Sequence, residues 1–189
     1  MVRRAPGNVC RGMTSRISGQ RSLADRPAIS GAAVAHRRRL CLWLDGRTDL
    51  LTPRTAIITY VVTFLAFVLI DLVWLLNAGV PMFRAILGDI ILDQPRMAPA
   101  ILFYLLFPVG ILYFASLPAL AARSLATAAV RGGAFGFFTY MTYELTNHAT
   151  LRLWSWNLVV IDTLWGAALT AVSAVLGVAV ARWFSERPA

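Results

Sequence analysis

Four long apolar segments constrain the fold of this chain more than any other feature of its sequence. They cover residues 56–76, 98–117, 128–147 and 157–183. A helix rises about 1.5 Å per residue, so about 20 residues cross the roughly 30 Å hydrocarbon core of a bilayer. The hydrophobic share of 58% also exceeds that of ordinary soluble domains. We therefore predict an all-α integral membrane protein, with a four-helix bundle in residues 55–183.

The parts around these segments add detail to the predicted bundle. After Pro81, apolar residues recur at helical spacing between charged ones; they are Phe83, Ile86, Leu87, Ile90 and Ile91. This pattern predicts a short interfacial helix at the membrane surface between the first two spans, although a loop packed on the bundle fits the same residues. Pro108 should kink the second span. In the third span, the spacing Gly132-xxx-Gly136 permits close contact with another helix.

Residues 1–54 hold most of the positive charge. They contain 11 of the 18 basic residues and 3 of the 9 acids, so the remainder of the chain is nearly neutral. This confinement of charge disfavours a nucleic-acid partner. The composition of the extension is typical of disorder, and a cytoplasmic tail that touches anionic lipid fits it. It also fits a gene-model artefact, in which the mature protein begins near Leu51.

The arginines outside the spans predict the orientation. If successive spans alternate sides, one side carries Arg54, Arg123, Arg131, Arg182 and Arg187, and the other carries Arg84, Arg96 and Arg152. Cytoplasmic loops have an excess of basic residues. We therefore predict a multi-pass protein of the cell inner membrane, with both termini in the cytoplasm.

Three acids lie inside apolar segments: Asp71, Glu144 and Asp162. A charged side chain at the bilayer centre costs about 2.5–3.5 kcal/mol on insertion scales, so such residues usually face protein or water. In the predicted topology, Asp71 and Asp162 lie roughly 9 Å below the outer surface, and Glu144 lies roughly 5 Å below it. Acids from the first, third and fourth spans should therefore converge on a polar pocket in the outer leaflet.

Helical spacing places further polar and aromatic side chains beside the acids. An Asp-x-x-Trp pair occurs in the first and fourth spans, and an indole N–H can donate to a carboxylate. In the third span, Tyr140, Glu144, Asn147 and His148 form one stripe. The candidate ligand-binding or proton-relay residues are Asp71, Trp74, Tyr140, Tyr143, Glu144, Asn147, Asp162 and Trp165. The weaker candidates for a metal site are Asp71, Glu144, His148 and Asp162.

Three motifs occur along the chain in a distinctive order. They are Asp71-x-x-Trp74, then Tyr143-Glu144-Leu145-Thr146-Asn147 followed by Ala149-Thr150-Leu151, and finally Asp162-x-x-Trp165-Gly166. Over about residues 55–182 the chain resembles a bacterial family of predicted membrane proteins, domain of unknown function 2177. The resemblance implies a four-helix integral membrane protein and no particular activity. The family pattern usually has aspartate where this chain has Glu144, and it has no counterpart of the residues before 52.

Several functions fit this pattern. The acids could only fix the register of the helices, or they could bind a small solute, a cation or protons in a carrier. A carrier with four spans would need to form a homodimer. A membrane-embedded lipid-modifying enzyme is a further hypothesis, although no HExxH, nucleophile-elbow or phosphate-loop motif occurs. The chain could also be the non-catalytic partner subunit of another membrane protein. We favour solute or ion binding over catalysis, and the sequence identifies no cofactor.

Overall fold

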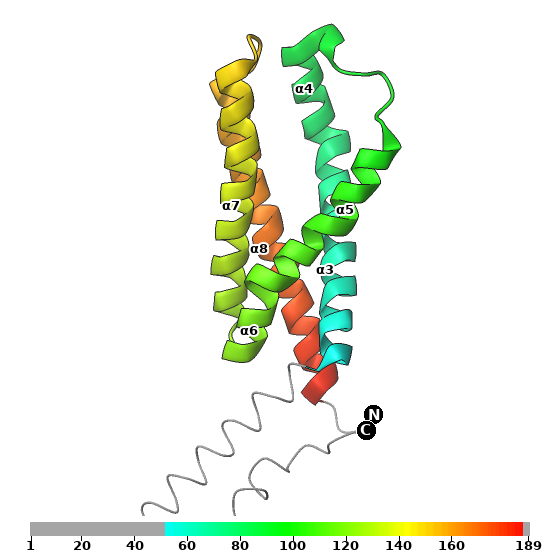
Figure 1. Cartoon of the computed structure of the whole chain (residues 1–189), viewed down its shortest axis with the longest axis vertical. Helices are drawn as coiled ribbons and strands as arrows, with labels where there is room; N and C mark the ends of the chain where they lie inside the picture. Colours follow the sequence, from blue (N-terminus) through cyan, green and yellow to red (C-terminus); the bar gives the residue numbers. More distant parts are fainter. Residues whose placement is uncertain (1–51, 187–189) are drawn as a thin grey trace, which may run out of the picture. The chain divides into compact units, whose positions relative to one another are not determined.

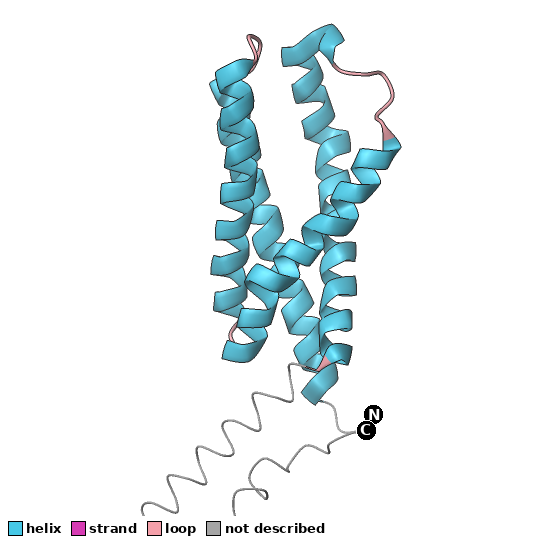
Figure 2. Cartoon of the chain, in the orientation of Figure 1, coloured by secondary structure: helices cyan, strands magenta, loops and turns pink. Residues whose placement is uncertain are grey.

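The computed structural model describes residues 52–186, and every regular element in this part of the chain is a helix (Figure 2). The elements are α3 (Pro53–Trp74), η3 (Leu75–Gly79), α4 (Val80–Leu87), η4 (Gly88–Ile90), α5 (Met97–Ile111), η5 (Leu112–Ser116), α6 (Leu117–Ala122), α7 (Leu125–Thr150) and α8 (Trp156–Glu186). The predicted all-α class is confirmed for these residues. The predicted basic extension lies almost entirely outside the described residues, and so does Arg187.

Within residues 52–186, three helical runs are long and apolar enough to cross a membrane: Pro53–Ile90, Met97–Ala122 and Trp156–Ser185. Large apolar side chains on each of them are exposed, as Leu69, Leu106 and Leu164 illustrate. Such continuous apolar surface is unusual on a soluble protein and suits contact with lipid. The remaining long helix, α7, has 26 residues but is less apolar than these three runs.

Helices that follow one another along the chain run in opposite directions, except that α3 and α4 form one run and α5 and α6 form another (Figure 1). At one end of the bundle, Thr55 Oγ1 in α3 lies 3.5 Å from Ser185 Oγ in α8. At the same end, Arg182 Nη1 donates a hydrogen bond of 3.2 Å to the carbonyl oxygen of Arg123, in the turn between α6 and α7. The opposite end holds α4 and the loop between α7 and α8. Helices α3 and α7 therefore point toward that opposite end, and α5 and α8 point away from it.

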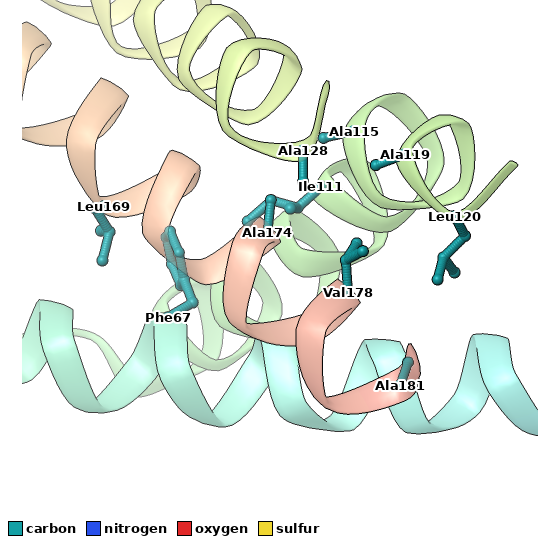
Figure 3. Packing of buried hydrophobic residues seen from close by; sticks show 10 residues of the cluster. All are labelled: Phe67, Ile111, Ala115, Ala119, Leu120, Ala128, Leu169, Ala174, Val178 and Ala181. Carbon is teal, nitrogen blue, oxygen red and sulfur yellow. The ribbon is translucent and has the colours of Figure 1, made fainter. Parts of the chain in front are cut away.

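Helix α8 packs against both α3 and α7 and supplies much of the apolar core (Figure 3). The buried core residues are Phe67, Ile111, Ala115, Ala119, Leu120, Ala128, Leu169, Ala174, Val178 and Ala181. Half of them are alanines, so the helix backbones lie close together. Small residues at helix contacts are the usual way in which membrane helices gain packing energy, because lipid is as apolar as the side chains themselves.

The closest contact between α7 and α8 depends on glycine. A Cβ atom on Gly136 would lie 2.6 Å from Thr170 Oγ1 and nearer still to the carbonyl oxygen of Gly166. A Cβ atom on Gly132 would lie 2.9 Å from the carbonyl oxygen of Thr170. Backbone atoms cannot move aside cheaply, so these positions require glycine. The predicted Gly132-xxx-Gly136 face is therefore the face that contacts α8, and it brings the polar half of α7 against this helix.

Each of the first two runs contains one π-helical turn, and a proline follows two residues after the end of each turn. After η3, the Val80 N–H donates to the carbonyl of Leu75, and Pro81 follows. After η5, the Leu117 N–H donates to the carbonyl of Leu112, and Pro118 follows. Proline cannot donate a backbone hydrogen bond, and its ring clashes with the carbonyl four residues earlier. A wide turn at this position relieves the clash, as π-turns inside α-helices commonly do.

The predicted surface helix is not separate from the first span. Helix α4 continues α3 through η3, so the run extends to Ile90 instead of ending near residue 76. The apolar face that we assigned to the membrane surface packs on protein, because Leu87 lies in a buried cluster with Trp154, Leu158 and Val159. An amphipathic pattern records only that one face is apolar, and it does not distinguish lipid from protein as the partner of that face.

Candidate functional site

Asp71 lies on the buried face of α3 and has two hydrogen-bond donors from other helices. The Tyr104 hydroxyl on α5 donates to Asp71 Oδ2 at 2.8 Å. The Trp165 indole N–H on α8 donates to Asp71 Oδ1 at 3.2 Å. The side chain is only 5% exposed. Through these two hydrogen bonds, Asp71 links α3 to α5 and α8. Hydrogen bonds to an ionised group are stronger than those between neutral groups.

The two Asp-x-x-Trp pairs meet across the contact between α3 and α8. The rings of Trp74 and Trp165 stack with centroids 5.0 Å apart and an interplanar angle of 12°. Trp165 donates to Asp71, in the opposite helix, and not to Asp162 in its own helix. Trp165 therefore donates its indole N–H to a carboxylate, as expected. Trp74 instead packs against the Trp165 ring.

Glu144 is fully buried on α7. Its Oε2 accepts a hydrogen bond of 2.7 Å from the indole N–H of Trp154, which lies in the loop between α7 and α8. Its Oε1 meets no N–H or O–H donor among the described residues. A buried carboxyl oxygen without a donor costs free energy, so this atom is the least satisfied polar atom of the cluster.

The nearest acid to Glu144 in this cluster is Asp162 on α8, and the two carboxyl groups interact electrostatically across the contact between α7 and α8. Asp162 is 5% exposed. Two neighbouring carboxylates repel in a medium of low dielectric constant, whereas a carboxylic acid O–H can donate to a carboxylate. Such a pair is therefore favourable only when one of its two carboxyl groups carries a proton.

Tyr140 completes the connection between the acids. Its ring packs against Gly166, where any side chain would collide with it. The phenol interacts electrostatically with Asp71, Asp162 and Tyr104. Asp162 also interacts electrostatically with Asp71. The structure thus gathers acids from α3, α7 and α8 into one cluster, and no basic side chain of the described residues pairs with them.

The remaining predicted residues lie at the edge of this cluster. Tyr143 is 54% exposed and packs edge-on against Trp154, and Asn147 lies one turn further along α7. His148 is turned away, because its Nδ1 lies 2.9 Å from the carbonyl oxygen of Trp154 and its ring contacts Trp156. Among the described residues, no three His, Cys, Asp or Glu side chains come together as a possible metal site.

The acid cluster is separate from a groove that the described residues form on α7. A groove of about 590 Å³ runs along the outer face of α7, beside η5. It is lined by Phe114, Arg131, Ala134, Phe135, Phe138, Thr139 and Thr142. None of the three acids lines it. This groove therefore gives no support to the predicted polar pocket around the acids.

Sequence reasoning missed two members of the cluster. Neither Tyr104 nor Trp154 was among the candidate residues. Both are aromatic donors that reach an acid on another element. The only signal in the sequence was that each carries an N–H or O–H group next to an apolar segment, which does not specify a partner.

Comparison with known proteins gives one informative result. The family described as "Predicted membrane protein (DUF2177)" matches residues 56–179. This match confirms the resemblance carried by the three sequence motifs, and it includes all three buried acids. No curated protein and no solved structure matches the chain.

Proposed function

The chain belongs to this family of predicted membrane proteins, and on that premise we propose that it crosses the bilayer four times and carries protons through its acid cluster. The observation that supports the proposal is that two buried carboxyl groups, Glu144 and Asp162, interact electrostatically across the contact between α7 and α8. A site that holds one proton between two buried acids can exchange it without moving an unpaired charge into the apolar core.

The fourth crossing is α7, and its lower hydropathy follows from its packing. With 26 residues it extends for about 39 Å, longer than the roughly 30 Å hydrocarbon core. The glycines that lower its hydropathy face α8, as Gly132 and Gly136 show. Its outward side chains include Val130 and Phe138, which are 71% and 60% exposed. Lipid would meet these apolar side chains and not the polar face.

The arginines favour one orientation of this bundle. The end that holds the start of α3 and the end of α8 also carries Arg54, Arg123 and Arg182. By the excess of basic residues on the cytoplasmic side, this end faces the cytoplasm of the cell, with both termini. The acid cluster lies toward the opposite end, since Asp71 is 18 residues, about 27 Å, beyond Pro53. It would then exchange protons with the outer side of an inner membrane.

A stripe of hydroxyl groups leads from the cytoplasmic end toward the cluster. On α3, residues at every fourth position are buried: Thr55, Thr59, Thr63, Phe67 and Asp71. Thr63 Oγ1 has no hydrogen-bond partner among the described residues, and Thr170 Oγ1 on α8 has none either. Hydroxyls can both donate and accept, so they suit proton transfer through intervening water. Phe67, fully buried among aromatic rings, closes the stripe one turn before Asp71.

Purified protein in liposomes would test this function. A pH step across the membrane is followed with a pH-sensitive dye inside the vesicles, and a potassium ionophore prevents charge build-up. We expect the wild-type protein to speed proton entry above that of empty vesicles. We expect Glu144→Gln and Asp162→Asn to return it to the level of empty vesicles. Asp93→Asn, which changes an exposed loop acid, is the matched control and should behave as wild type.

Two results would count against proton carriage. One is wild-type vesicles that are no more permeable to protons than empty ones. The other is Glu144→Gln protein that folds and conducts as wild type does, which would leave the acids a role in fixing the register of the helices.

A further inference from the structure

The groove on the outer face of α7 is separate from the acid cluster and has its own chemistry. Phe114 of η5 and Phe135 of α7 form one wall, with stacked rings whose centroids are 5.3 Å apart. The wide turn of η5 and the absence of a side chain at Gly110 make room for the Phe135 ring. Ala134 and Phe138 are exposed along the groove. The groove is therefore a built feature of the packing of η5 on α7.

The middle and far end of the groove offer no free hydrogen-bonding group. The Thr139 hydroxyl donates to the carbonyl of Phe135 at 2.8 Å. The Thr142 hydroxyl donates to the carbonyl of Phe138 at 2.7 Å. Because both hydroxyls are satisfied by their own helix, the surface between them accepts an apolar occupant without loss of a hydrogen bond.

One end of the groove carries a positive charge. Arg131 is exposed, and its side chain has no hydrogen bond or ion pair with the described part of the chain. It lies in the first half of α7, which begins directly after the turn that contains Arg123. Arginine presents several N–H donors in a planar fork that matches phosphate oxygens. An apolar groove with an unpaired arginine at one end is complementary to a chain with an anionic head.

The length of the groove fits one leaflet of a bilayer. From Arg131 to Thr142 there are 11 residues of helix, which extend for about 16 Å. Half of a roughly 30 Å hydrocarbon core is about 15 Å. An acyl chain that begins at the level of Arg131 would therefore reach the end of the groove near the middle of the membrane.

We propose that this groove is a binding site for one anionic phospholipid of the surrounding bilayer. Its phosphodiester contacts Arg131, and one acyl chain lies between Phe114 and Phe138. The polar contact and the apolar contact lie on one face of one helix, so both can be made by a single lipid molecule. The site is independent of the proton-binding cluster, which lies on the opposite face of α7.

Native mass spectrometry of the full chain in detergent would test the proposal. The probes are phosphatidylglycerol, which is anionic, and phosphatidylcholine, which is neutral overall. We expect wild-type protein to bind one phosphatidylglycerol more tightly than phosphatidylcholine. Arg131→Gln should weaken phosphatidylglycerol about fivefold, the effect of one arginine near an anionic lipid surface. Arg152→Gln, an exposed arginine at the opposite end, is the control and should leave it unchanged.

A second pair of variants tests the apolar part of the groove. Ala134→Trp fills the groove and should weaken both lipids, whereas Ala149→Trp, at an exposed position of α7 beyond the groove, should weaken neither. The proposal is wrong if Arg131→Gln binds phosphatidylglycerol as wild type does. It is also wrong if Ala134→Trp alters only the association of two copies of the chain, since the groove would then be an interface between protomers.

Discussion

At the contact between α7 and α8, replacing Gly136 by alanine should destabilise the protein. The same substitution at Gly133, three positions away, should leave its stability unchanged or raise it slightly. A Cβ atom on Gly136 would lie 2.6 Å from Thr170 Oγ1, whereas ordinary contact begins at 3.4 Å. The helices would have to separate by at least about 0.8 Å, and further because of the Gly166 carbonyl. Overpacking of this kind costs about 1–3 kcal/mol.

Gly133 provides the matched control. A Cβ atom on Gly133 would lie 3.7 Å from the Cβ of Ala171, an ordinary contact. Alanine is also favoured over glycine within a helix by about 0.5–1 kcal/mol. We therefore expect Gly136→Ala to lower the thermal unfolding midpoint by about 5 °C. We expect Gly133→Ala to leave it unchanged or to raise it slightly.

The assay is thermal unfolding of both purified variants in the same detergent, followed by circular dichroism. The separation in Gly136→Ala would also move Glu144, which is eight residues or about 12 Å along α7, away from Asp162. The reasoning is refuted if the two variants unfold at the same temperature, because the close approach of α7 and α8 would then not exist.

Two further predictions concern donors of the cluster, a third is their control, and all use the same unfolding assay. Tyr104→Phe removes one of two donors to Asp71. It should destabilise the protein by about 1.5–3 kcal/mol, the usual contribution of a hydrogen bond to a charged group. An unchanged unfolding midpoint would show that the hydrogen bond from Tyr104 to Asp71 does not stabilise the fold. Trp154→Phe keeps an aromatic ring but removes the donor to Glu144, so we expect a loss of similar size. Trp156→Phe, at a position that is 62% exposed, should change stability by less than about 0.5 kcal/mol, and an equal loss in both tryptophan variants would contradict the assigned bond.

The sequence predicted the helical segments because length and hydropathy are local properties. It also predicted that acids from three segments converge, since antiparallel helices bring equal depths together. Spacing identified the glycine face of α7, because Gly132 and Gly136 lie one turn apart on one side of the helix. These inferences required only the period of a helix and the alternation of helix directions.

Other features depended on which helix faces which, and the sequence does not contain that information directly. The partner of Asp71 is Trp165 on another helix, although Trp74 lies closer in the sequence. The continuation of α3 into α4 was missed because Pro81 was taken as a helix start, while a π-turn accommodates it inside a longer run. The stripe that contains Thr59 and Thr63 was also missed, since the sequence does not show which face of the first span meets another helix.

Infrared spectroscopy of the protein in lipid tests the shared proton most directly. A protonated carboxyl group has a carbonyl stretching band distinct from that of a carboxylate. We expect the wild-type protein to retain one such band at neutral pH. We expect Asp162→Asn to lose it, because an asparagine amide can donate to Glu144 without an extra proton. A wild-type spectrum without a protonated carboxyl band at neutral pH would contradict the account.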